Sequence, residues 1–463
     1  MIKTKEGGTQ FEHSLNHALE FFSKAGSLFT KRGSFYGNEE SALSLFQKSW
    51  IVDKRLSFKL LLWLRDIRGG AGNRSASREI YKWLAEYDPK WVEANLMNLL
   101  GAGRYDDLRS FYGTGLEDFA SSIWAYAIYA NKDVLAAKWA DRTDKPIRKH
   151  LRLDEAQFRK LLSKIRKDHI VEYKMCSKEW GTIDYEKVPS VAMSRYTKAF
   201  NRNDEKRFLE YKEGLKKGEK TVHASVLFPH DCVRTVLFGD REIADAQFNA
   251  LPNYLEDSNE RIIVISDTSG SMSKMVSGSI LAVHISQGMA LYCSAKIPES
   301  NPFHKKFIGF CSEGSFKNWE DMTFSQAVLN REIFDTAIGS TRIDKALDLI
   351  LETARFFKLT NDQLPSTIVV ISDMQFHNGV YGDGTEVDKA LDKWKEFNYT
   401  IPKIVYWNTA GYTGSPETVN KKNICMVSGF SPSILKNIFS GDDLSPVGVM
   451  LRTLEKYKVN IPN

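Results

Sequence analysis

An apolar, β-branched run that ends abruptly in a polar cluster constrains this chain most. Ile262–Ile265 is followed by Asp267, Ser269 and Ser271 within the stretch RIIVISDTSGSMS (261–273). Continuous apolar runs are typical of strands buried on both faces of a parallel sheet, and ligands bind just beyond the carboxyl ends of such strands. One carboxylate and two hydroxyls in a loop are hard oxygen ligands, which suit Mg²⁺. The stretch therefore predicts a parallel sheet with a cation site at one edge.

Two later segments carry side chains that would complete such a site. Thr341 ends the stretch IGST (338–341) just before an amphipathic run, and Asp373 follows a second buried strand, Thr367–Ser372. Because the carboxyl ends of parallel strands meet at one edge of a sheet, we expect both residues beside Asp267. The combination of a buried strand, a threonine before a helix and an aspartate after a strand is much more specific than D-x-S-x-S alone.

These motifs resemble the von Willebrand factor A domain with its metal-ion-dependent adhesion site. The resemblance assigns Asp267, Ser269 and Ser271 to the loop, Thr341 to the distant threonine and Asp373 to the distant aspartate. It implies that the hydroxyls contact Mg²⁺ or another divalent cation, that the carboxylates often act through water, and that an open position takes a carboxylate from a partner. All five positions are filled in the family's order. We therefore expect an intact metal site, the alternative being a remnant that binds no metal.

Length and composition restrict the class of protein. The chain has 463 residues, of which 42% are hydrophobic, and this size exceeds one ordinary core and fits two or three domains. It has no apolar run of about eighteen residues, so we expect no transmembrane helix and no membrane partner. The N-terminal MIKTKEGGTQFEH lacks the apolar segment of a secretory signal. The five cysteines are scattered without a C-x-x-C pair, which disfavours disulfides and zinc and favours a reducing, cytoplasmic location.

Positive charge is concentrated in one segment. Residues 142–220 contain 22 lysines and arginines against 13 aspartates and glutamates, whereas the rest of the chain has 42 against 45. Such a surplus is typical either of a solvated helical surface or of a face that binds a polyanion. Basic side chains interleaved with tyrosine and phenylalanine can bind a nucleic-acid strand through phosphate contacts and stacking. The candidate contacts here are Arg159, Lys160, Lys164, Arg166, Lys167, Arg195, Lys198 and Arg202.

A glycine-rich stretch carries a second group of arginines. RDIRGGAGNRSASR (65–78) interrupts a series of amphipathic helices, and Arg65, Arg68, Arg74 and Arg78 flank its glycines. The stretch has no G-K-[ST] and no preceding strand, which argues against a nucleotide P-loop. Two interpretations stay open. One is a plain connection between helices, and the other is a helix junction whose arginines and N-terminal amides meet nucleic-acid phosphates.

The helical part also resembles known proteins. Its motifs are R-D-x-R-G-G-x-G-x-R, the turn G-R-Y-D-D-L (103–108), W-x-x-I-x-Y-x-x-V-P-S-x-A-M (180–193) and K-x-F-x-R-x-D (198–204). They resemble a poorly characterised family of plants, bacteria and bacterial viruses that joins a helical domain to an A domain. That arrangement is similar to the Ro/TROVE proteins, in which a ring of helical repeats binds single-stranded RNA ends and structured small RNA. The resemblance implies a possibly ring-like helical domain and a small non-coding or single-stranded RNA partner.

The order of these patterns predicts the domain organisation. Helical periodicity with short connections dominates the first half, whereas strands and helices alternate in the second. We expect a loose N-terminus (1–10), an α-helical domain of HEAT-like repeats (11–240), a linker (241–260) and a doubly wound, Rossmann-like α/β domain of the A type (261–463).

The residue types indicate binding rather than catalysis. Ser269 and Ser271 lack a G-x-S-x-G elbow and an ordered histidine, and a metal ion that bridges to a carboxylate needs no proton transfer. We expect a non-enzymatic RNA-binding scaffold, similar to Ro ribonucleoproteins, with a Mg²⁺-dependent site for a protein or ligand carboxylate. Two alternatives stay open: a metal-dependent protein-interaction module without RNA binding, and a metal-dependent nuclease.

Overall fold

The structure is a computed structural model of the whole chain. It describes residues 2–3, 9–10, 16–28, 41–167, 169–256, 258–277, 280–334, 341–376, 386–409, 424–439 and 444–462. Helices dominate the described residues up to position 249, and strands alternate with helices beyond position 261. The expected fold class, a helical N-terminal half joined to an α/β C-terminal half, is confirmed.

The helical half is built from short amphipathic helices with polar N-caps. Asp53, Asn73 and Asp154 each accept a hydrogen bond from a backbone N–H in the first turn of the helix that follows. The helices are α1 (His17–Lys24), α2 (Ala42–Val52), α3 (Lys54–Arg65), α4 (Arg74–Tyr87), α5 (Pro89–Ala102), α6 (Glu117–Tyr129), α7 (Val134–Trp139), α8 (Lys145–Leu151), α9 (Glu155–Arg166), α10 (Val171–Cys176), α11 (Ser190–Asn203), α12 (Glu205–Lys217), α13 (Pro229–Phe238) and α14 (Arg241–Asn249).

The second half is a six-stranded sheet with helices between its strands. Its order is β10-β9-β8-β3-β6-β7, and every neighbouring pair is parallel except the edge pair β6 and β7. The elements are β3 (Ile262–Asp267), α15 (Ala282–Lys296), β6 (Lys306–Phe310), β7 (Gly314–Asn318), α16 (Phe324–Leu329), α17 (Ile343–Phe356), β8 (Thr367–Ser372), α18 (Glu386–Glu396), β9 (Lys403–Asn408), β10 (Ile424–Ser428), α19 (Ile434–Phe439) and α20 (Pro446–Glu455).

The strand order places a topological switch point between β3 and β8. From β3 the chain moves outward to β6 and β7, then returns to β8 on the other side of β3 and continues to β9 and β10. Every residue of β3 and of β8 is buried, as expected for strands covered on both faces. Ligands of doubly wound sheets bind outside the carboxyl ends of the strands at such a point.

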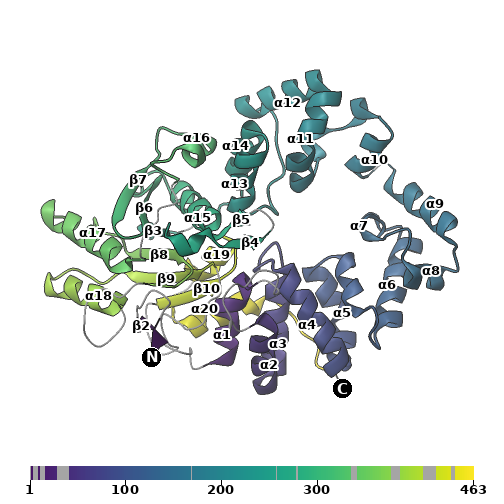
Figure 1. The fold of residues 1–463 in the computed structure, drawn as a ribbon, viewed down its shortest axis with the longest axis horizontal. Coiled ribbons are helices and arrows are strands. Elements are labelled where there is room, and N and C mark those ends of the chain that lie inside the picture. Colours follow the sequence, from purple (N-terminus) through teal and green to yellow (C-terminus); the bar gives the residue numbers. More distant parts are fainter. Residues whose placement is uncertain are drawn as a thin grey trace.

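Figure 1 shows the helices following one another in an arc that leaves the α/β part near α1 and returns to it at α13 and α14. At one end of the arc, α1 packs against β10 and α3 packs against α20. At the other end, α13 packs against α15 and α14 packs against α16. The arc and the α/β part therefore form one closed circuit.

The first junction of this circuit brings together segments far apart in the chain. The Ser428 Oγ donates to the Phe22 carbonyl (2.7 Å) and accepts from the Gly26 N–H (3.0 Å). The Asn73 side chain caps α4 and donates to the carbonyls of Ala25 (3.1 Å) and Leu28 (2.6 Å). The glycine-rich stretch 65–78 is thus a helix–helix connection that also holds the N-terminal segment in place.

The C-terminal segment closes on the same connection. The Tyr457 hydroxyl donates to the Asp66 carboxylate (2.9 Å), and the Lys456 ammonium lies 3.2 Å from it. Farther along, the Asn460 N–H donates to the Asn95 side chain (2.8 Å), which in turn donates to the Asn460 carbonyl (2.8 Å). These contacts fix the last described residues against α3 and α5.

The structure shows three local features that the predicted domain bounds did not include. The predicted linker 241–260 contains α14, because Asp240 caps it and Ile243, Ala244 and Phe248 are buried against neighbouring elements. The N-terminus expected to be loose (1–10) contains two paired strands, β1 (Ile2–Lys3) and β2 (Thr9–Gln10). The sequence also did not indicate a short antiparallel pair, β4 (Met275–Ser277) and β5 (Ile280–Leu281).

The sequence predicts no transmembrane helix, and the helices of the structure can be compared with this prediction. In the parts of the chain that the structure describes, no helix is both long enough and apolar enough to cross a bilayer.

Candidate functional site

The D-x-S-x-S loop lies directly at the carboxyl end of β3. Asp267 is the last residue of the strand, and a 3₁₀ turn, η5 (Gly270–Ser273), follows it. The Ser269 N–H donates to Asp267 Oδ1 (2.9 Å), and the Ser269 and Ser271 hydroxyls lie 3.1 Å apart. The Thr268 N–H is held by the Phe310 carbonyl of the neighbouring strand (2.9 Å). The loop therefore folds back so that the Asp267 carboxylate and the hydroxyls of Ser269 and Ser271 lie close together at the end of β3.

The two more distant candidates reach the same edge of the sheet. Asp373 follows β8, and the preceding Ser372 donates from its hydroxyl to Asp267 Oδ2 (2.5 Å). Thr341 precedes α17 and is fully buried, and the next residue, Arg342, donates its N–H to the Cys311 carbonyl just beyond β6 (2.9 Å). All five predicted residues thus come from segments that meet at the switch point, while 335–340 lie outside the described residues.

Two adjacent carboxylates are buried at this point. Asp267 and Asp373 have no exposed surface. Burial and the neighbouring Asp373 charge raise the pKa of Asp267 to about 7, although hydrogen bonds from Ser269 and Ser372 act in the opposite direction. Placing two negative charges together away from water is costly unless a positive charge compensates them.

The donor set fits a hard divalent cation. The five side chains supply carboxylate and hydroxyl oxygens only, which is the ligand chemistry that Mg²⁺ prefers, and two carboxylates would balance the charge of the ion. In the described part of the chain, no group of three or more His, Cys, Asp and Glu side chains is arranged so that it could hold a metal ion. The cation site would therefore depend on hydroxyl ligands, as the sequence motif requires.

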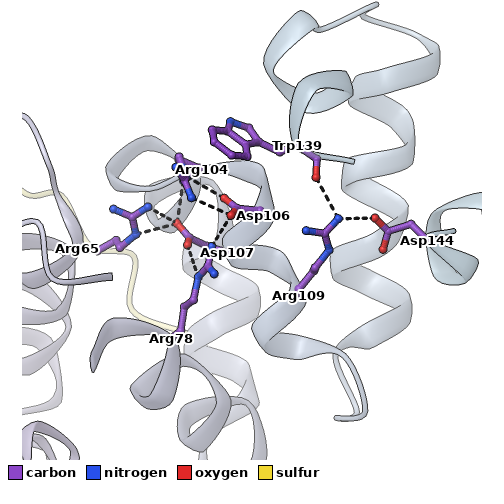
Figure 2. A network of polar contacts seen from close by, with 8 residues as sticks. All are labelled: Arg65, Arg78, Arg104, Asp106, Asp107, Arg109, Trp139 and Asp144. Carbon is purple, nitrogen blue, oxygen red and sulfur yellow. Dashed lines mark hydrogen bonds and ion pairs between the residues drawn. The ribbon is translucent and has the colours of Figure 1, made fainter. Parts of the chain in front are cut away.

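The structure separates the predicted RNA-contact residues into two groups. Figure 2 shows that Arg65 and Arg78 belong to an internal network of charges. Arg65 is buried and donates to Asp107 Oδ2 (2.8 Å), and Arg78 donates to Asp107 Oδ1 (2.7 Å) and pairs with Asp106 (2.7 Å). Both arginines therefore hold the turn η2 (Tyr105–Phe111) against α3 and α4, which occupies their guanidinium groups.

The same network contains residues that were not among the candidates. Arg104 binds Asp106 through two nitrogens (2.9 and 2.8 Å) and lies over the Trp139 ring, 3.8 Å from its centroid. Arg109 donates to Asp144 (2.7 Å) and to the Trp139 carbonyl (3.0 Å), as drawn in Figure 2. The paired aspartates of the G-R-Y-D-D-L turn were the signal in the sequence, but they do not reveal which arginines they bind.

Arg166 has a structural role as well. Its guanidinium donates to the Ala137 carbonyl (2.8 Å from Nε) and the Ala140 carbonyl (2.6 Å from Nη2), at the C-terminal end of α7. Burial lowers the pKa of Arg166. Because its donors satisfy the terminal carbonyls of α7, Arg166 joins α9 to α7 and is not available to a phosphate.

The remaining candidates form a second group, which we call the exposed basic set. These side chains are exposed, and the structure shows no ion pair for them in the chain segments it describes. Arg74 lies at the edge of the internal network, where partial burial and the charges of Arg104, Arg78 and Arg65 lower its pKa. The set consists of Arg68, Arg74, Arg159, Lys160, Lys164, Lys167, Arg195, Lys198 and Arg202.

Comparisons with known proteins match both halves of the chain. Residues 120–264 match a domain of unknown function (DUF2828), and residues 261–451 match another (DUF7788). An uncharacterised protein of Acanthamoeba polyphaga mimivirus is 26% identical over 486 residues, covering 90% of this chain and 82% of that protein. The similarity to the mimivirus protein thus spans the helical and α/β halves together.

A solved structure overlaps the chain more loosely. The Ro (RSR) protein of Deinococcus radiodurans is 14% identical, with a TM-score of 0.37, and the overlap covers 96% of this chain and 99% of that one. With so low a TM-score and identity, this likeness says nothing about the function of the chain.

Proposed function

We propose that this chain is a non-enzymatic RNA-binding scaffold whose α/β half carries a divalent-cation site for a partner's carboxylate. The observation that supports RNA binding is the exposed basic set. These side chains project from α4, α9 and α11 and from the residues next to α4 and α9, and the structure records no ion pair for them among the described residues. Cations without internal partners are free to replace the counterions of a phosphate backbone.

A binding assay with RNA tests this proposal. We expect the protein to bind a labelled single-stranded RNA with an affinity that falls steeply as salt rises, because phosphate contacts release counterions. The variant Lys160→Glu with Lys164→Glu on α9 should weaken binding about tenfold or more and reduce the salt slope. A matched control, Lys82→Glu with Lys90→Glu, changes the charge equally at exposed lysines outside the basic set. Equal losses in both variants would reduce the proposal to a nonspecific effect of net charge.

The second function has its own supporting observation, the two buried carboxylates at the switch point. When bound there, a Mg²⁺ ion would offer an open coordination position to a carboxylate of a protein partner. Asp267, Ser269, Ser271, Thr341 and Asp373 are the residues that would hold the ion, three through hydroxyls and two through carboxylates. The described contacts orient one of these groups, because the Ser269 N–H and the Ser372 hydroxyl both donate to Asp267.

Mg²⁺ titration followed by thermal unfolding tests this site. We expect Mg²⁺ to raise the midpoint of the wild-type protein relative to EDTA, because an ion that binds only the folded state stabilises it. Asp267→Asn should remove this response, and Asp362→Asn, an exposed carboxylate, should keep it. A response that persists in Asp267→Asn would place the ion elsewhere.

The nuclease alternative predicts a product. Incubation of RNA with the protein and Mg²⁺ should leave the RNA intact if the protein is a scaffold. RNA fragments that form with the wild type but not with Asp267→Asn would favour the nuclease instead.

We also place the protein in the cytoplasm, in line with its five free cysteines.

A further inference from the structure

A groove between α11 and α13 gathers positive charge from both helices. Arg195 and Lys198 of α11 line one side, and Arg234 of α13 lines the other. All three side chains are exposed, and within the described ranges none forms an ion pair. The sequence singled out Arg195 and Lys198 but not Arg234, which lies 36 residues beyond Lys198 and reaches the groove only through the packing of the helices.

The carboxylates that line the groove are already engaged. Asp231 accepts the Phe228 N–H (2.9 Å) at the start of α13. Asp240 caps α14 through one oxygen and lies 3.2 Å from the Lys212 ammonium through the other. The three basic side chains outnumber the two lining carboxylates, one of which also pairs with Lys212, so the groove keeps a surplus of positive charge, which favours an anionic ligand.

Apolar side chains line the same groove. Phe238 at the end of α13 is 60% exposed and Val191 at the start of α11 is 49% exposed. The cavity measures about 420 Å³, which lies in the usual size range of small-ligand sites. An exposed aromatic ring beside basic side chains suits a nucleotide. The base can stack on the ring, and the phosphate can bind to the positive charges.

We propose that the groove between α11 and α13 binds one nucleotide, with its phosphate at Arg195, Lys198 and Arg234 and its base against Phe238. The nucleotide is either a free mononucleotide or one unit of a bound RNA strand, and the second case rests on the proposed RNA-binding function. Charge-assisted hydrogen bonds from arginine and lysine give the phosphate most of the affinity, and stacking adds a smaller share.

Calorimetric titration of the full-length protein with 5′-AMP tests the groove directly. We expect adenosine, which lacks the phosphate, to bind at least about tenfold more weakly than 5′-AMP. The variant Arg195→Glu with Lys198→Glu should weaken 5′-AMP binding about tenfold or more, and Phe238→Ala should weaken it several-fold. The matched control is Lys82→Glu with Lys90→Glu, which changes the net charge equally at exposed residues outside both the groove lining and the exposed basic set. It should leave 5′-AMP affinity unchanged, and thermal midpoints confirm that each variant is folded.

A second arm with a short single-stranded RNA separates the two sources of the nucleotide. If the groove variant weakens RNA binding more than the control variant does, the groove holds a unit of the strand, even when free 5′-AMP binds weakly. If 5′-AMP binding is lost in the groove variant but the wild-type protein binds no RNA, the groove takes a free nucleotide and the RNA scaffold proposal fails. Equal effects of the groove and control variants on both 5′-AMP and RNA would overturn the proposed site.

Discussion

Asp107 is a buried carboxylate that two arginines hold, one through each oxygen. Arg65 and Arg78 each lie within 2.8 Å of one of its oxygens, and Arg65 is itself buried. A buried ion pair adds little net stability when it is complete, because both charges lose their hydration. Removal of one partner is much more costly, since the remaining charge stays buried without compensation.

Arg65→Gln tests this role at the scale of a single residue. We expect a loss of roughly 3–5 kcal/mol in the free energy of unfolding, because Asp107 loses a buried charge partner. Arg68→Gln removes a neighbouring but exposed arginine and should change the stability by less than about 0.5 kcal/mol. Thermal or denaturant unfolding measures both. Equal stabilities would mean that Arg65 is as solvent-accessible as Arg68 and that the network is not structural.

Asp267 gives a prediction that depends on pH. Its pKa of about 7 in the folded chain exceeds the value of 3.8 for an ordinary aspartate, so the folded state holds a proton that the unfolded state has lost between these pH values. The wild-type carboxyl therefore destabilises the metal-free fold increasingly as pH rises from about 4 to about 7, and the effect stays constant above that. In EDTA, Asp267→Asn should raise the thermal midpoint by several degrees at pH 8 and by much less at pH 5. A difference that is independent of pH would contradict the raised pKa.

At the scale of elements, α14 shows how a helix attaches one half of the chain to the other. Its Asp245 carboxylate accepts hydrogen bonds from the N–H (2.6 Å) and hydroxyl (2.7 Å) of Ser325 at the start of α16. Phe248 stacks on Phe324, with ring centroids 3.9 Å apart. These contacts make α14 a structural joint between the arc and the α/β half.

Asp245→Ala should loosen this joint without unfolding the sheet. The Ser325 N–H and hydroxyl lose their acceptor, at a cost of about 1–3 kcal/mol. We expect faster amide hydrogen exchange in 241–249 and 323–329 and unchanged exchange in β3 and β8. Asp321→Ala, at an exposed carboxylate nearby, serves as the control. Faster exchange throughout the sheet would show that the joint and the sheet unfold together.

The sequence predicted strands that are buried along their whole length. It did not predict elements and side chains whose roles depend on partners far away in the chain. The strands around Ile262 and Thr367 were evident because β-branched residues buried on both faces leave an unbroken apolar run. The meeting of the five residues at one edge of the sheet could be expected, because Asp267 ends β3 and Asp373 follows the neighbouring parallel strand β8. That they hold a cation stays a prediction. Helix α14 was missed because its apolar residues are few and find their partners in other helices, namely α11, α12, α13 and α16. The roles of Arg65 and Arg166 were missed because their acceptors lie 42 and 29 residues away.

At the scale of the whole molecule, close backbone packing holds the first junction of the circuit. A Cβ atom on Gly26 would lie 2.8 Å from backbone atoms of both Ser428 and Gly429, and Gly429 in turn has a φ of +102° and packs against Ala71. Only residues without side chains allow the N-terminal segment, β10 and the glycine-rich connection to approach so closely.

Gly26→Ala should therefore open the junction between α1 and β10. The added methyl group meets backbone atoms, which cannot rotate away, so the segments have to separate. We expect a lower thermal midpoint and faster proteolysis near residues 16–28, together with a larger radius of gyration in solution scattering. Gly101→Ala is a suitable control, because a Cβ there meets nothing within 4 Å. A variant as compact and as resistant to proteolysis as the wild type would show that the junction is looser than the structure indicates.

The hydrogen bond between Ser428 and the Phe22 carbonyl joins residues 406 positions apart. During synthesis, α1 leaves the ribosome long before β10 exists, so α1 can pack early against α2 and α3 but not against the sheet. All helices of the arc are synthesised before β10, so the circuit cannot close at this junction until the chain is nearly complete. If a ribosome stalls before β10 is made, one end of the arc has no contact with the sheet. The apolar face of α1 that packs against β10 then stays uncovered.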